Sequence, residues 1–183
     1  MLGKKRITTC YFAGGLALSL LLGRPGLAAD LLPDAVGVRA AYSITTIDRN
    51  YVQTQLFADW DLPWRSERTN GWYFATGLDL ALGDLKCRDS VAFVGSLGPT
   101  LRVGYGDFPV FVEGGCSPTM LSRHEFGVNN YGCNFQFTTY GGVGVALGRR
   151  WEMACRFQHM SNAGLAQPNP GLNLLGLSLR YNF

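Results

Sequence analysis

Residues 72–82 read WYFATGLDLAL, and the alternation within this stretch decides the fold class. One face of the extended chain carries large apolar side chains: Trp72, Phe74, Leu78, Leu80 and Leu82. The other face carries polar or smaller ones: Tyr73, Ala75, Gly77, Asp79 and Ala81. Because side chains alternate between the two faces of a strand, this period of two predicts a β-strand. A run of this length and pattern is typical of a strand that crosses a membrane.

The same period recurs along the chain and predicts eight strands. They are residues 34–44, 50–62, 71–83, 91–104, 108–116, 133–147, 150–161 and 172–183. Tight turns are expected at 66–71, 104–107 and 148–150, and a longer loop at 117–132. An even number of strands places both chain ends on the same side of a membrane barrel. The sequence therefore predicts an all-β protein, a single eight-stranded antiparallel transmembrane β-barrel with its apolar band facing outward.

Composition supports this class of fold. Charged residues make up 16% of the chain, against about 25% in typical soluble proteins. No block of like charge indicates a nucleic-acid partner. The alternative is a soluble secreted barrel of the lipocalin type, in which the apolar face points inward and the charged face meets water. The terminal Phe183 and the aromatic residues near strand ends favour the membrane barrel.

The N-terminal residues 1–29 have the features of a cleaved secretory signal peptide. Lys4, Lys5 and Arg6 precede an apolar stretch from Ile7 to Gly23, and small residues follow up to Ala29. The apolar stretch is short and interrupted by threonine and glycine, which argues against a retained membrane anchor. We therefore expect residues 30–183 to form one exported domain.

Residues 156–173, RFQHMSNAGLAQPNPGLN, contain the candidate chemistry. His159 and Ser161 are two residues apart in a predicted strand, so their side chains share one face. An imidazole beside a hydroxyl can accept its proton and make the oxygen nucleophilic. A His-x-Ser pair alone is a weak signal, because most such pairs are incidental.

The surrounding residues strengthen it. HMSNAGL at 159–165, followed by PNPGLN at 168–173, closely resembles the signature of the lipid A 3-O-deacylases, the PagL family of outer-membrane β-barrel esterases. The resemblance is strongest from Arg156 to the C-terminus. It implies hydrolysis of the 3-position ester-linked acyl chain of lipopolysaccharide lipid A. It also implies Ser161 as nucleophile, His159 as base, and Asn162, Asn169 and the Ala163–Gly164 backbone as the oxyanion and substrate neighbourhood.

Alternation also predicts where this site faces. His159 and Ser161 share a face with Trp151, Met153, Cys155 and Phe157, whereas Glu152 lies on the opposite face. Asn173 shares its face with the leucines of the last strand, so all three candidate residues should face lipid. Nine residues separate Arg150 from His159, which is about 21 Å of rise at a tilt of about 45° and reaches the external leaflet.

Asn173 departs from the family pattern. The resemblance implies an acidic residue that orients the histidine where this chain has an asparagine. An amide can hold an imidazole tautomer, but it cannot balance an imidazolium charge. Glu152 does not replace it, because it lies on the wrong face and too low.

Cysteines remain at 87, 116, 133 and 155 beyond the signal, and export permits disulfides. Three pairings are possible and stay open; of these, a bridge between Cys116 and Cys133, closing the 117–132 loop, is the one we favour. No spaced cysteine or histidine pairs indicate a metal site, and no cofactor is expected. His124 is interpreted as a solvated loop residue.

We expect a protein of the bacterial outer membrane that contacts lipopolysaccharide and membrane lipids. The oligomeric state, a homodimer included, stays open. Two alternative functions also remain: a non-catalytic structural or adhesive barrel, and a lipid A acyltransferase.

Overall fold

The computed structural model describes residues 32–44, 50–67 and 70–183. Its strands are β1 (Ala35–Ser43), β2 (Tyr51–Glu67), β3 (Trp72–Cys87), β4 (Ser90–Tyr105), β5 (Val110–Leu121), β6 (Glu125–Phe126), β7 (Asn129–Asn130), β8 (Phe135–Leu147), β9 (Trp151–Ser161) and β10 (Leu172–Asn182). The predicted signal peptide at 1–29 lies outside the described residues. None of the described residues forms a helix long and apolar enough to span a membrane.

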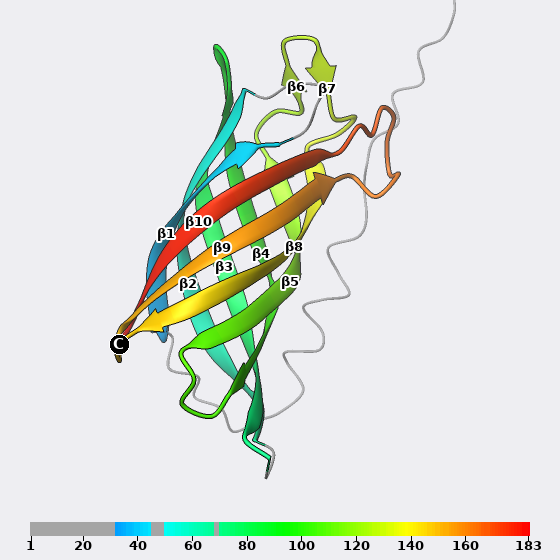
Figure 1. Ribbon diagram of the computed structural model, residues 1–183. Coiled ribbons are helices and arrows are strands. Elements are labelled where there is room, and N and C mark those ends of the chain that lie inside the picture. The colour runs from blue at the N-terminus through cyan, green and yellow to red at the C-terminus, as the bar shows by residue number, and fades with distance from the viewer. Residues whose placement is uncertain (1–31, 45–49, 68–69) are drawn as a thin grey trace, which may run out of the picture. The chain divides into compact units, whose positions relative to one another are not determined.

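Eight of these strands close into an antiparallel barrel in the order β1-β10-β9-β8-β5-β4-β3-β2 (Figure 1). Neighbours in sequence are neighbours in the sheet, and β1 pairs with β10 to complete the ring. The predicted fold class is confirmed. The start of β1 and the C-terminus meet at one end of the barrel, where the Phe183 N–H donates to the Asp34 carbonyl at 3.1 Å. We call this the terminal end, and the opposite end, where β9 and β10 are joined by residues 162–171, the loop end.

The predicted alternation holds around the barrel. Large apolar side chains on its outer surface include Val38, Leu56, Leu82, Phe93, Leu101, Val143, Phe157 and Leu177, all more than one third exposed. Aromatic side chains pair near the terminal end: Trp72 with Tyr105 at 5.4 Å between ring centroids, and Trp151 with Tyr181 at 5.0 Å. An apolar band with aromatic residues at its edge is the exterior of a membrane barrel.

The lumen holds the charged residues that the sequence places on the opposite face. Ion pairs link strands across it, among them Arg39 with Asp79, Arg102 with Glu152, Arg156 with Glu113, and Arg180 with Asp59. Pairing is needed there because a buried charge without a partner is strongly destabilising. The soluble-barrel alternative required these charges outside, so the inward placement contradicts it.

Towards the loop end the lumen becomes apolar. Buried side chains fill it: Tyr51, Leu85, Cys87, Ala92, Val94, Leu121, Phe126, Tyr131, Met160, Leu172 and Leu174. Two of these residues, Phe126 and Tyr131, come from the connection between β5 and β8 rather than from a barrel strand. That connection is therefore tied into the core of the barrel.

Several strands run further than the sequence predicts. β3 extends to Cys87 and meets β4 at Ser90, so the hairpin turns on Arg88 and Asp89, with Arg88 at a φ of 51°. β5 continues through Pro118 to Leu121 rather than ending at residue 116. The predicted loop at 117–132 is accordingly shorter, and it contains the small β6–β7 ribbon.

The expected disulfide between Cys116 and Cys133 is wrong for the same reason. With β5 reaching Leu121, Cys116 lies about six residues below the position opposite Cys133, or about 20 Å along the strand. A disulfide requires Cα atoms within about 7 Å. Instead, the Thr139 hydroxyl donates to Cys116 Sγ at 3.4 Å, and Cys133 Sγ donates to the Phe135 carbonyl at 3.1 Å.

Candidate active site

The candidate site is built on the outer surface of β9 and β10, which lie side by side in Figure 1 (orange and red). Register places Asn173 directly opposite His159. Their side chains meet outside the barrel, with Nδ1 of His159 2.7 Å from Oδ1 of Asn173. Since an amide oxygen only accepts, Nδ1 carries the hydrogen and Nε2 has the free lone pair.

Ser161 is the last residue of β9 and lies on the same outward face as His159. Two residues of strand separate their Cα atoms by about 6.6 Å, which places both side chains at one surface position. His159 is exposed, whereas Ser161 and Asn173 are half-buried. The structure therefore brings the predicted base and the predicted orienting residue into contact, with the predicted nucleophile beside them.

Gly171 is a supporting residue that the sequence did not single out. It has a φ of 69°, and a Cβ atom at this position would lie 2.8 Å from Cε1 of His159. A side chain would displace the imidazole from Asn173. The signal in the sequence was the Pro-Gly pair before the last strand, which reads as an ordinary turn.

Asn162 follows Ser161 but points into the barrel, where it is fully buried. Its Nδ2 donates to the carbonyls of Tyr131 at 2.9 Å and Ala166 at 3.0 Å. Its Oδ1 accepts from the Gly164 N–H at 2.9 Å. The Asn162 side chain thus holds the β9–β10 loop (residues 162–171) together from the inside and does not share the outward face of Ser161.

Asn169 reaches back across the same loop. Its Oδ1 accepts from the Asn162 N–H at 3.1 Å, which fixes the plane of the amide. Ala163 and Gly164 both have left-handed backbone, with φ of 52° and 80°, and both are exposed. Left-handed backbone is strained for alanine, and strain of this kind often marks functional loops.

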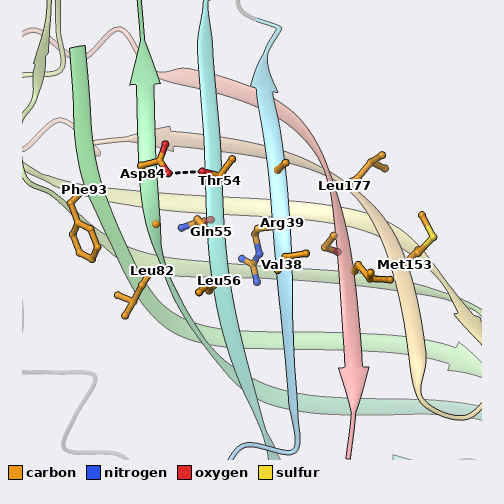
Figure 2. A pocket seen from close by; sticks show the side chains of 14 residues that line it. Val38, Arg39, Thr54, Gln55, Leu56, Leu82, Asp84, Phe93, Met153 and Leu177 are labelled. Atoms are coloured by element: carbon orange, nitrogen blue, oxygen red, sulfur yellow. Dashed lines mark hydrogen bonds between the residues drawn. The ribbon is translucent and has the colours of Figure 1, made fainter. Parts of the chain in front are cut away.

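An apolar groove of about 670 Å³ runs across the outer wall from β9 and β10 to β3 and β4 (Figure 2). Its outward-facing lining includes Met153 of β9, Leu177 of β10, Val38 of β1 and Leu56 of β2. Leu177 lies four residues from Asn173 on the same face of β10, about 13 Å along the strand. The groove therefore starts on the two strands that carry the site.

The remaining candidates lie elsewhere. Glu152 points into the lumen and pairs with Arg102 at 2.9 Å, as its predicted face requires. His124 is half-buried, and its Nδ1 lies 2.5 Å from Oδ1 of Asn134. Within residues 32–44, 50–67 and 70–183, no three His, Cys, Asp or Glu side chains are grouped to hold a metal ion.

This chain is similar to a protein family and to a named relative. The family model described as Lipid A 3-O-deacylase (PagL) matches residues 49–182. The lipid A deacylase PagL of Bordetella bronchiseptica is 36% identical over 73 residues, which are 40% of this chain and 41% of that protein. The match thus spans about two fifths of the length of that relative.

Two solved structures are similar to this chain. The crystal structure of the outer membrane enzyme PagL superposes with a TM-score of 0.69 at 22% identity, covering 80% of this chain and 99% of that one. Neisserial surface protein A gives a TM-score of 0.49 at 14% identity, covering 81% and 95%. At such identities the first likeness shows the fold alone.

Proposed function

This chain belongs to the lipid A 3-O-deacylase (PagL) family, and on that premise we propose that it is a serine esterase of the bacterial outer membrane. It hydrolyses the ester that links the 3-position acyl chain to lipid A, using Ser161 as nucleophile. The observation that supports this most directly is the 2.7 Å contact between His159 Nδ1 and Asn173 Oδ1 beside Ser161.

The contact supports Nε2 as the imidazole nitrogen that exchanges protons in the proposed reaction. With Nδ1–H donated to Asn173, Nε2 of His159 accepts the proton of the Ser161 hydroxyl as its oxygen attacks the ester carbonyl. The tetrahedral intermediate collapses, the sugar oxygen leaves with the proton from Nε2, and an acyl-serine remains. Water, deprotonated by Nε2, then attacks the acyl-serine. The fatty acid is released as the Ser161 oxygen leaves and takes the proton back from Nε2.

The β9–β10 loop is suited to stabilise the oxyanion. Because Asn169 Oδ1 is occupied by the Asn162 N–H, its Nδ2 is turned away from that bond and can donate to the oxyanion. The neighbouring amides of Asn162 and Gly164 already donate to side-chain oxygens, which makes the Ala163 N–H the second candidate donor. Removing one such donor typically costs about 3 kcal/mol of transition-state stabilisation.

The position of the site fits a lipid substrate. His159 and Ser161 lie on the apolar outer wall near the loop end, so an ester approaches from within the membrane rather than through the lumen. The groove at Met153, Leu177, Val38 and Leu56 is apolar and takes the acyl chain in this proposal. The aromatic pairs at the terminal end mark the opposite membrane boundary.

Mass spectrometry of lipid A from a Gram-negative host that lacks its own deacylase tests the proposal. Expression of the parent chain should remove the mass of one 3-hydroxyacyl group, and Ser161→Ala and His159→Ala should abolish that change. Both variants should retain heat-modifiable gel migration, which reports an assembled barrel. A gain of acyl mass would instead identify a transferase, an unchanged spectrum a non-catalytic barrel, and activity in Ser161→Ala another nucleophile.

A further inference from the structure

A contact between two connections at the loop end has no role in the mechanism described above. The carbonyl oxygen of Tyr131, between β7 and β8, accepts two side-chain amides. Asn162 Nδ2 lies 2.9 Å from it and Gln136 Nε2 lies 3.3 Å from it. Both donors are fully buried. A carbonyl that bonds two buried amides is a fixed point, because displacing it would leave polar groups unsatisfied.

Tyr131 is itself held on several sides. Tyr131 is 4% exposed, and its ring packs edge-on against Tyr51 and Phe126, at 6.0 and 6.1 Å between centroids. Its N–H donates to the His124 carbonyl at 2.9 Å. Gln136 also donates to the Cys133 carbonyl at 2.6 Å, which braces the chain on the other side of Tyr131. The position of this carbonyl is therefore set by the barrel core.

The next residue, Gly132, brings the backbone against the β9–β10 loop. A Cβ atom at Gly132 would lie 2.5 Å from the Pro168 carbonyl oxygen and 2.8 Å from Asn162 Nδ2. Both distances are shorter than real Cβ contacts, and the first is to backbone, so the loop would have to move. Gly132 also has a φ of 80°. A glycine is needed there for close approach as well as for conformation.

We propose that Tyr131, Gly132 and Gln136 are positioning residues for catalysis, acting through Asn162 on the oxyanion side of the site. This inference rests on the proposed deacylase function. Asn162 links the Tyr131 carbonyl to the β9–β10 loop. Its Nδ2 donates to that carbonyl, its Oδ1 accepts from the Gly164 N–H, and its own N–H donates to Asn169 Oδ1. A displacement of Asn162 should therefore move Asn169 and the Ala163–Gly164 turn together, whereas the His159–Asn173 pair is held by the pairing of β9 with β10.

Gly132→Ala tests this, with Gly127→Ala as its matched control. Gly127 also has a positive φ, 61°, but a Cβ atom there meets nothing within 4 Å. The two variants carry similar backbone strain and differ in contact with the β9–β10 loop. We expect Gly132→Ala to lower kcat about 10- to 100-fold, because sub-ångström to ångström displacement of catalytic groups has effects of that order. KM should stay near the parent value in both variants, and kcat of Gly127→Ala should match the parent.

Gln136→Met provides a second variant, free of backbone strain, that removes the side-chain donor to the Tyr131 and Cys133 carbonyls and keeps side-chain volume. A selective loss of kcat is expected there too, and this variant decides the matter if Gly132→Ala does not assemble into a heat-modifiable barrel. Parent kcat in either assembled variant, or equal losses in Gly132→Ala and Gly127→Ala, would overturn the inference. Failure of the proposed function is separate: the parent would then release no fatty acid, or Ser161→Ala would release as much.

Discussion

Replacing Asn173 by aspartate should make this enzyme faster. The substitution keeps the size and acceptor geometry of the side chain that lies 2.7 Å from His159 Nδ1, and adds a negative charge. That charge attracts His159 most strongly when the imidazole is protonated, in the transition states of acylation and deacylation. An interaction made only in the transition state raises kcat rather than substrate affinity.

The exposure of the pair sets the size of the gain. Charge centres about 4 Å apart attract by about 1 kcal/mol in water and about 4 kcal/mol at an effective dielectric constant near 20. His159 is exposed and Asn173 half-buried, so the lower part of this range applies. About 1–2 kcal/mol corresponds to a gain in kcat of about 5- to 30-fold.

The assay is release of 3-hydroxy fatty acid from purified lipid A by detergent-solubilised protein, followed over time by mass spectrometry at saturating substrate. The gain of Asn173→Asp over the parent should shrink as salt is raised, since exposed charges are screened. Asn173→Ala, which removes the acceptor, should lower kcat about tenfold or more. Parent rates in both variants would refute the reasoning, because Asn173 would then not orient His159.

Three further outcomes are expected. Asn169→Ala should lower kcat about 100-fold with KM little changed, because an oxyanion donor is lost; a kcat within about twofold of the parent would remove Asn169 from the mechanism. Glu113→Gln should destabilise the barrel by about 3–5 kcal/mol, because Arg156 is left as a buried charge, and denaturant titration should show a lower midpoint; an unchanged midpoint would mean that the pair contributes little. Ala40→Phe places a ring in the groove lined by Leu56 and Leu177 and should raise KM for long 3-acyl chains but not for short ones, measured on substrates of both lengths; equal effects on both would place the chain elsewhere.

The outward direction of the site could be predicted from the sequence because it depends only on a period of two. His159, Ser161 and Asn173 fall on the face that also carries Phe157 and Leu175, and a strand cannot turn one of them inward without turning its neighbours. The lumen charges follow from the same rule. The register that places Asn173 against His159 does not follow from alternation alone, and the pairing was implied by the family resemblance.

Strand ends were harder to predict, because local composition opposed the outcome. Ser117 and Pro118 read as the start of a loop, yet β5 passes through both, with Pro118 opposite Phe137 of β8. Proline removes a ladder donor, and the β4–β5 pairing is interrupted between Ser96–Thr119 and Thr100–Gly115. The closed ring supplies pairing on the other side, so tertiary context overrides the local signal.

The contact between the Asn162 side chain and the Tyr131 carbonyl could not be predicted from the sequence. Tyr131 and Asn162 are 31 residues apart, and their contact joins a main-chain carbonyl to a side chain, so no residue pattern reports it. The family resemblance implies a place for Asn162 in the oxyanion neighbourhood. Its inward direction, directly before the left-handed turn at Ala163 and Gly164, is what makes it a support for the loop.

Because the candidate site lies on the outer wall, the substrate concentration that matters is the one within the membrane. In the proposed mechanism, substrate reaches His159 and Ser161 by lateral diffusion within one leaflet, so the rate should depend on the mole fraction of substrate among the surrounding lipids. Adding inert lipid or detergent should slow turnover even when the total amount of substrate per volume is constant. The deacylated lipid remains in the same leaflet and should compete with substrate for the site on the outer wall. Accumulation of this product should therefore limit the fraction of substrate that is hydrolysed.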